Sequence, residues 1–247
     1  MRGLGQLTFA SLKLFLREPV GAFFTLAFAP LLVILFGAIY GNDPTPLFGG
    51  YGSMDITMPG YTALILGTVG IMGVPITVGG YRERGVLRRY RATPMHPLTF
   101  IVSDVVTNLI MALLGILLLV LMGWLMYRVQ FEGQILSILL AAIFSGLSMF
   151  SFGYLIACLA PGARAAQVIG MVVFYPMMFL SGSGMPLEIM PPSVQRISEF
   201  LPLTYVVKLL RGLWFGDGWG AHLKEVGILA GILVVCTALA ARFFRWE

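Results

Sequence analysis

Apolar runs of about twenty residues recur along the whole length of this 247-residue chain. A helix of that length is what crosses the hydrocarbon core of a bilayer. The composition agrees, because 58% of the residues are hydrophobic and 11% are charged, against about 25% charged in ordinary soluble domains. The sequence therefore predicts an all-α membrane protein, and it excludes a soluble enzyme with one anchor or a disordered chain.

Apolar length predicts six membrane-spanning helices, and the stretches between them are too short for a separate catalytic domain. The predicted spans cover residues 20–40, 58–80, 101–126, 135–160, 165–180 and 226–244. Eleven of the sixteen lysines and arginines lie on the side shared by the two termini. The positive-inside rule then puts both termini in the cytoplasm of a plasma or inner membrane. We treat residues 1–247 as one transmembrane domain.

Residues 1–19 precede the first span and predict an amphipathic helix. On a helical wheel Arg2, Gln6, Lys13 and Arg17 share one narrow sector, and leucines occupy much of the remainder. Such a helix lies in the cytoplasmic interface of the membrane. It either anchors the chain to the surface or also docks a cytoplasmic subunit.

Residues 181–224 form the longest segment outside the predicted spans. Prolines break its apolar residues into two short helical pieces, near 194–201 and 205–215, and neither piece is long enough to cross a bilayer. Trp214 and Trp219 suit the aromatic belt at a membrane interface. We therefore expect a hairpin of two short helices that dips into, or lies on, the outer leaflet.

The chain lacks several chemical signatures. None of its three lysines follows a glycine, so there is no phosphate-binding loop, and we expect no ATP hydrolysis by this chain alone. Cys158 and Cys236 lie in apolar stretches without metal-ligand spacing, so we expect no metal site. The centres of the predicted spans lack carboxylates and histidines, which disfavours coupling to protons or sodium.

Three further polar or small-residue features have modest interpretations. Asn108 and Gln167, inside spans, are expected to make interhelical hydrogen bonds. The serines of 181–184 resemble the setting of an intramembrane nucleophile, but no histidine lies in a span to act as its base. Gly227 and Gly231 have the GxxxG spacing of a packing face, a spacing that is also common by chance.

The densest charge cluster is residues 81–94, between the second and third predicted spans. On a helix Arg84, Arg88 and Arg91 would share one face, and Glu83 has no arginine at i+3 or i+4 to pair with. From charge alone the cluster is either a topology signal with some headgroup binding or a docking surface.

Two motifs carry a resemblance to a known family. Residues 82–89 followed by Ala92-Thr93-Pro94 resemble the cytoplasmic coupling segment of type-2 ATP-binding-cassette exporter permeases, here residues 81–97. In the longest loop, residues 180–182, Pro186, Pro191, 201–205 and 211–212 resemble the re-entrant hairpin that precedes the last span in that family. Val86 departs from the pattern, since the family often has threonine there.

The resemblance implies a half-transporter. This chain forms the translocation path together with a second permease chain. We expect that second chain to be another copy of this one, although a close relative would meet the same requirements. Two separate ATPase subunits dock on the cytoplasmic side and bind ATP and magnesium. Membrane lipids surround the assembly, and no nucleic acid partner is expected. The expected cargo is a lipophilic drug-like, antibiotic or lipid molecule, as in drug efflux and antibiotic resistance. The alternatives are a polysaccharide or other biogenesis substrate, or an ATP-independent channel, carrier or membrane enzyme.

The resemblance also assigns residues. Coupling to the ATPase falls to Glu83, Arg84, Gly85, Arg88 and Arg89. The translocation path falls to aromatic and flexible apolar side chains of spans one, two and five, namely Phe24, Phe28, Met72, Phe174, Tyr175, Met177 and Met178. The outer gate falls to the hairpin residues Gly182, Pro186, Pro202 and Tyr205.

Overall fold

The computed structural model describes residues 22–85 and 97–243, together with six isolated positions before residue 16. Thirteen of the nineteen residues of the expected interfacial helix at 1–19 lie outside these residues, as do Arg88 and Arg89 of the expected coupling segment. In the described part every regular element is a helix, which confirms the predicted all-α class.

Six continuous helical stretches are long and apolar enough to cross a membrane, as the sequence predicts. Their bounds are Phe23–Tyr40, Ser53–Glu83, Ile101–Tyr127, Ile135–Leu159, Ala163–Leu180 and Trp219–Phe243. The first contains the π-helix η1 (Phe23–Ala27) and α3 (Phe28–Tyr40). The third lies within α7 (Pro97–Tyr127), the fourth is α8 (Ile135–Leu159) and the fifth is α9 (Ala163–Leu180). The last joins η5 (Trp219–His222) to α12 (Leu223–Phe243).

The second stretch is the centre of the bundle. It runs through α4 (Ser53–Gly67), the π-helical η3 (Thr68–Gly73) and α5 (Val74–Glu83), and nearly every residue of α4 is buried. Pro75, two residues after η3, cannot donate the usual helical hydrogen bond, so the regular α-helical pattern is interrupted here. At this point α8 packs backbone to backbone, because a Cβ on Gly153 would lie 1.9 Å from the carbonyl oxygen of Gly70.

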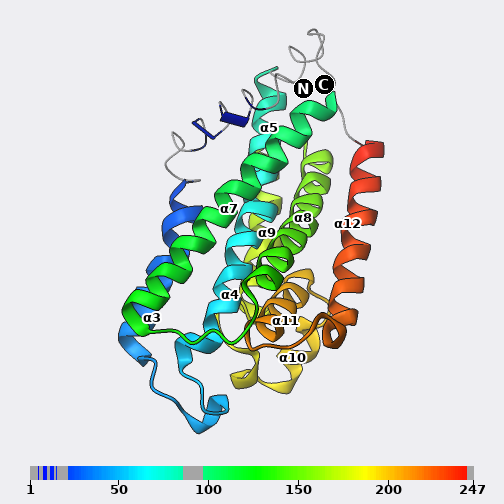
Figure 1. Cartoon of the computed structure of the whole chain (residues 1–247). Coiled ribbons are helices and arrows are strands. Elements are labelled where there is room, and N and C mark those ends of the chain that lie inside the picture. Colours follow the sequence, from blue (N-terminus) through cyan, green and yellow to red (C-terminus); the bar gives the residue numbers. More distant parts are fainter. Residues whose placement is uncertain are drawn as a thin grey trace.

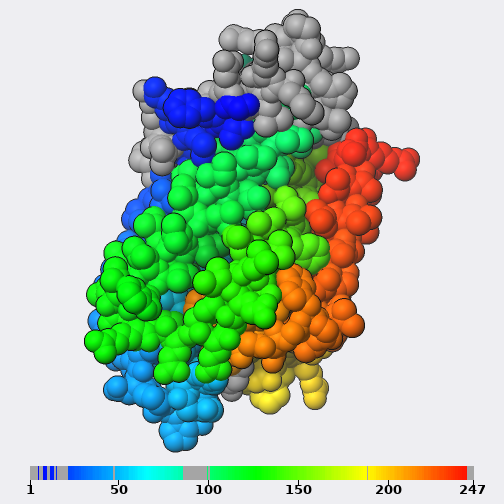
Figure 2. All heavy atoms as spheres, viewed as in Figure 1, coloured from blue at the N-terminus to red at the C-terminus, as the bar shows by residue number. Residues whose placement is uncertain are grey.

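Successive long helices run in opposite directions (Figure 1). We call the end with Glu83 and the start of α9 the upper end, and the end with the α3–α4 connection and α11 the lower end, as they stand in Figure 1. The first stretch begins and the last stretch ends toward the upper end (Figure 1), as six crossings require. Side chains of α7 and α8 fill the face between α3 and α12 in the space-filling view (Figure 2).

Short helices complete the lower end. The 3-10 turn η2 (Pro46–Phe48) lies in the α3–α4 connection, and η4 (Leu187–Ile189), α10 (Pro192–Ser198) and α11 (Pro202–Trp214) follow α9. The predicted pair of short helices is therefore present. One side of α11 packs on α4, and most of α11 is buried.

Candidate functional site

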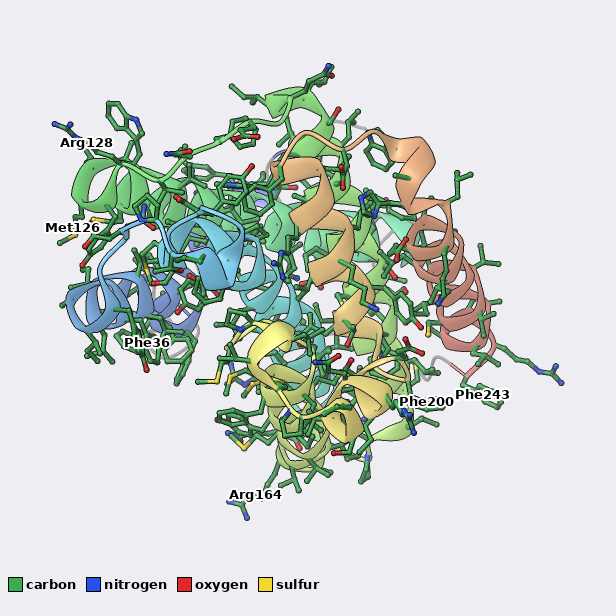
Figure 3. All side chains as sticks on the ribbon, turned by 90° about the horizontal axis from the view of Figure 1, so that it is seen from below. Phe36, Met126, Arg128, Arg164, Phe200 and Phe243 are labelled. Atoms are coloured by element: carbon green, nitrogen blue, oxygen red, sulfur yellow. The ribbon has the colours of Figure 1, made fainter. Side chains whose placement is uncertain are left out.

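A hollow opens at the lower end between α3, α4 and the segment after α9. Its volume is about 360 Å³ and its walls are mostly apolar. Phe36 stands on the side of α3 that borders this hollow (Figure 3). The lining residues are Phe36, Tyr40, Thr45, Phe48, Ser53, Met54, Thr57, Tyr61, Gly184, Met185, Pro186 and Ile189. Aromatic rings and methionines in one concave surface suit lipophilic molecules of varied shape.

The outward face of α9 is a second exposed surface. Val168, Val172, Tyr175 and Phe179 are all exposed, and their spacing puts them on one stripe of the helix. Gln167 beside them is exposed as well. An amide and a phenol on the open face of a spanning helix are costly against hydrocarbon. This face therefore favours contact with another protein chain or with a polar path over contact with lipid alone.

The expected path residues divide into two groups. Phe24 is exposed and its ring centroid is 5.4 Å from that of Phe28. Met72, Tyr175 and Met178 are exposed or half-buried. Phe174 and Met177, in contrast, are only 3% and 6% exposed and pack in the core. In this conformation these two side chains stabilise α9 against the bundle instead of lining an open surface.

The expected gate residues hold the segment after α9 in place. Gly182 has φ of 86°, and its carbonyl oxygen comes within 2.9 Å of where a Cβ on Gly60 would lie. Pro186 lines the hollow, and Pro202 is the first residue of α11. The Tyr205 hydroxyl donates a 2.5 Å hydrogen bond to the Glu199 carbonyl, which fixes the α10–α11 corner.

The two buried serines of this segment bond locally. Ser181 Oγ donates to Ser183 Oγ at 3.1 Å, and Ser183 Oγ donates to the Met178 carbonyl at 3.0 Å. His222 lies instead beside Asp217 and Glu225. The serines therefore close the turn after α9, and the described residues offer them no base.

At the upper end the expected coupling residues Glu83, Arg84 and Gly85 close α5. Gly85 has φ of 66°, a left-handed conformation that ends the helix without a Cβ clash. Arg84 is exposed. The sequence left Glu83 without a partner in its own helix, and the structure provides one: Glu83 Oε1 accepts a 2.8 Å hydrogen bond from the Ala163 N–H.

A polar cluster at the lower end was not predicted from the sequence. Asp55 is 2% exposed, and its carboxylate accepts bonds from Asn42 Nδ2 (3.1 Å), the Gly52 N–H (3.0 Å) and the Gln130 N–H (2.9 Å). Asn42 Nδ2 also donates to the Tyr127 carbonyl at 3.1 Å. We call Asn42 and Asp55 the lower clasp. An acidic residue followed directly by an apolar span is the signal that could have indicated it.

One expectation for a polar span residue is wrong in detail. Asn108 donates to the carbonyl and carboxylate of Asp104, one turn earlier in its own helix, at 2.9 and 3.2 Å, so these bonds are not interhelical. The interhelical bond comes from Tyr154 of α8, whose hydroxyl donates to Asp104 Oδ2 at 2.5 Å. Asp104 thus has partners for its buried oxygens, which gives it a packing role between α7 and α8.

These observations first define a class. Six apolar crossings around a central interrupted helix, with a hollow face and no metal-binding cluster among the described residues, describe a multi-pass membrane protein. A family model then identifies it more closely. The model of the ABC-2 type transporter matches residues 2–215, so the chain belongs to that family. Its members are transport permeases, which are not enzymes by themselves.

Curated relatives agree. The chain is 26% identical over 161 residues to the Escherichia coli K12 protein named "Probable multidrug ABC transporter permease YbhR", a match covering 65% of this chain and 44% of that one. It is 31% identical over 101 residues to Nodulation protein J of Rhizobium leguminosarum bv. viciae, covering 41% of this chain and 39% of the relative. The matched part thus spans less than half the length of these relatives.

Proposed function

We propose that this chain is the membrane-spanning subunit of an ATP-driven exporter that moves a lipophilic drug-like, antibiotic or lipid molecule out of the cytoplasm or the inner leaflet. ABC-2 permeases generally work with a separate ATPase subunit. Two copies of that subunit would bind ATP and magnesium at the upper end, which would face the cytoplasm of a plasma or inner membrane. ATP binding would supply the free-energy difference between inward-open and outward-open states.

The path would lie between two copies of this chain, along α3, α4 and α9. The observation that carries this assignment is the exposed face of α9, on which Gln167 and Tyr175 are both open to the surroundings of the bundle, together with the apolar hollow at the lower end. A second copy would cover these polar groups and turn the hollow into an enclosed chamber. The segment from Ser181 to Tyr205 would act as the outer gate and dip into the outer leaflet.

Affinity purification from the native membrane tests the partner assignment. We expect a stoichiometric ATPase to co-purify and to hydrolyse ATP, and a pair of permease chains per complex by native mass spectrometry. Recovery of a single chain with no ATPase under mild extraction would contradict the proposal and favour an ATP-independent channel, carrier or enzyme.

Transport of a named probe tests the path. We expect Tyr175→Ala to change the rate of ethidium export from cells by severalfold, while Val234→Ala, an exposed position on α12, leaves it unchanged. Equal export by both variants would return Tyr175 to a packing or lipid-facing role. The similarity to Nodulation protein J, whose name refers to no drug, keeps a polysaccharide or other biogenesis substrate as the second candidate. That reading predicts no ethidium export by the wild-type complex.

A further inference from the structure

Two consecutive residues at the end of α5, Arg82 and Glu83, form hydrogen bonds with the two ends of the turn that joins α8 to α9. The Arg82 guanidinium donates to the carbonyls of Ala157, at 3.4 Å, and Ala160, where α8 ends. The Glu83 carboxylate accepts from the Ala163 N–H, where α9 begins. Cations are favoured at helix carboxyl ends and anions at helix amino ends, so each charge matches the helix end that it binds. We call this pair the upper clamp.

Glycines allow the upper clamp to form. A Cβ on Gly79 would lie 2.9 Å from the Cα of Ala163, so α5 and the start of α9 are in backbone contact. A Cβ on Gly162 would lie 2.2 Å from Glu83 Oε1, in the space that the carboxylate occupies. Gly162 itself has extended backbone, with φ of −168° and ψ of 179°. An alanine can adopt that conformation, so its side chain would displace the carboxylate without straining the chain.

The connectivity gives the upper clamp a mechanical role. The Arg82 and Glu83 side chains extend from the last turn of α5, immediately before the segment that leads to α7. Their partners are the last turn of α8 and the first residue of α9, and α9 leads at its other end to the hollow and to Gly182. A displacement of the end of α5 would therefore be passed through Glu83 to the start of α9 and through Arg82 to the end of α8.

We infer that Arg82 and Glu83 are positioning residues that transmit movement of the segment after α5 to α9, and that Glu83 acts through Ala163 of its own chain instead of contacting the ATPase. This inference rests on the proposed function, since it deepens the coupling step of the same exporter. It predicts a separable defect. Without the upper clamp the ATPase still binds and still hydrolyses ATP, but α9 no longer moves together with the end of α5.

A spin-label experiment on the complex purified with its ATPase tests this inference. The native cysteines are replaced by alanine, and labels are placed at the exposed positions Leu121 of α7 and Phe179 of α9. The α7–α9 distance is measured with and without ATP and vanadate, beside ATPase binding and the hydrolysis rate. Glu83→Ala, Gly162→Ala and their combination are compared with wild type. Arg164→Gln is the matched control, because Arg164 belongs to the same turn region but points away from the bundle (Figure 3).

In wild type and Arg164→Gln we expect an ATP-dependent change in the label distance. In Glu83→Ala and Gly162→Ala we expect ATPase binding and hydrolysis to persist, while the population that shifts on ATP binding falls about fivefold or more, within the usual range of coupling between sites. The combined variant should be no worse than either single variant, because both remove the same contact. Glu83→Gln keeps an acceptor for the Ala163 N–H and should restore part of the shift. If Glu83→Ala fails to fold, Gly162→Ala carries the comparison, because it displaces the carboxylate and leaves Glu83 unchanged.

The remaining outcomes separate the two proposals. A normal distance change in Glu83→Ala, or additive losses in the combined variant, would overturn the upper clamp as a transmitter. Loss of ATPase binding in Glu83→Ala would also overturn it and would assign Glu83 to direct contact with the partner, leaving the exporter function intact. Failure of wild type itself to bind an ATPase would overturn the proposed function.

Discussion

The two ends of the bundle are fastened in different ways. In the lower clasp one carboxylate, that of Asp55, is buried and accepts three N–H donors, two from the α3–α4 connection and one from the α7–α8 connection. In the upper clamp the Glu83 carboxylate is exposed and accepts one. A buried acceptor with many partners is expensive to disturb, whereas an exposed one competes with water and is cheap to release. The difference suggests a fixed lower end and an upper end that can be reset.

The largest expected effect comes from removing the lower clasp. Asp55→Ala leaves the Asn42 amide and the N–H groups of Gly52 and Gln130 without their acceptor. At about 1 kcal/mol for each of the three hydrogen bonds lost, we expect the free energy of unfolding to fall by about 3 kcal/mol. Thermal unfolding of the purified chain in detergent measures this. Asp43→Ala, an exposed carboxylate in the same connection, is the control and should stay within about 0.5 kcal/mol of wild type. Equal stability of the two variants would remove the contrast between the ends.

A second change tests the contact that lies between the ends. Gly153→Ala places a methyl group against the Gly70 carbonyl, and because both partners are backbone, relief requires α8 and η3 to move apart. We expect a loss of about 2 kcal/mol in the free energy of unfolding, measured as above. Gly227→Ala and Gly231→Ala meet open space in this chain and should be neutral. A neutral Gly153→Ala would mean that α8 and η3 slide easily, so that the middle of the bundle resembles the upper end.

The third change applies the same measurement to the upper clamp. Glu83→Ala removes a cap from the first turn of α9, a loss of about 1 kcal/mol, which is smaller than that expected for Asp55→Ala because Glu83 is exposed. Arg164→Gln again serves as the control. A loss as large as that of Asp55→Ala would show that the upper clamp is a structural fastening and would argue against a resettable upper end.

How much of the structure can be predicted from the sequence depends on whether a residue's contacts lie near it in the chain or far from it. Hydropathy located the six spans because apolar length is a local property. The predicted fourth and fifth spans, 135–160 and 165–180, match Ile135–Leu159 and Ala163–Leu180 closely. The second span was predicted to begin at residue 58 but begins at Ser53. Asp55 was therefore left outside the predicted span. Its burial depends on Gln130, which lies 75 residues further along the chain and so gives no local signal.

The candidate site shows the same division. The helical spacing of exposed residues on α9 is legible in the sequence, but which side of α9 faces the core is not, so Phe174 and Met177 were expected on the path although they lie inside the bundle. Likewise the sequence showed that Glu83 lacked an arginine on its own helix, but Ala163 lies 80 residues away. The spacing of Gly227 and Gly231 indicated a packing face, and in this chain both positions are open. Contacts between distant segments decided each of these cases.

The smallest expected effect concerns an exposed contact at the lower end. It tests whether the exposed connections at this end are held as firmly as the lower clasp. Tyr51, in the α3–α4 connection, packs against Phe215 with ring centroids 4.6 Å apart and donates a 3.2 Å hydrogen bond to the Glu132 carboxylate. Partial burial of the ring, followed by this hydrogen bond and the charge of Glu132, raises the pKa of the Tyr51 phenol above its ordinary value. Because the folded state holds this proton more tightly, the contact contributes stability below the ordinary tyrosine pKa, about 10, and loses it as the pH rises through the raised pKa.

Glu132→Gln should lower the pKa of Tyr51 part of the way back, because the charge is removed while the burial remains. The measurement is the tyrosinate absorbance during an alkaline titration, with the curve of a Tyr51→Phe chain subtracted to isolate one phenol. Glu199→Gln, an exposed carboxylate elsewhere on the lower end, should leave the Tyr51 curve unchanged. If Glu132→Gln also leaves it unchanged, the contact with Glu132 is too loose to influence the phenol. The firmness of the lower end would then belong to the lower clasp and its buried partners, and would not extend to the exposed connections around them.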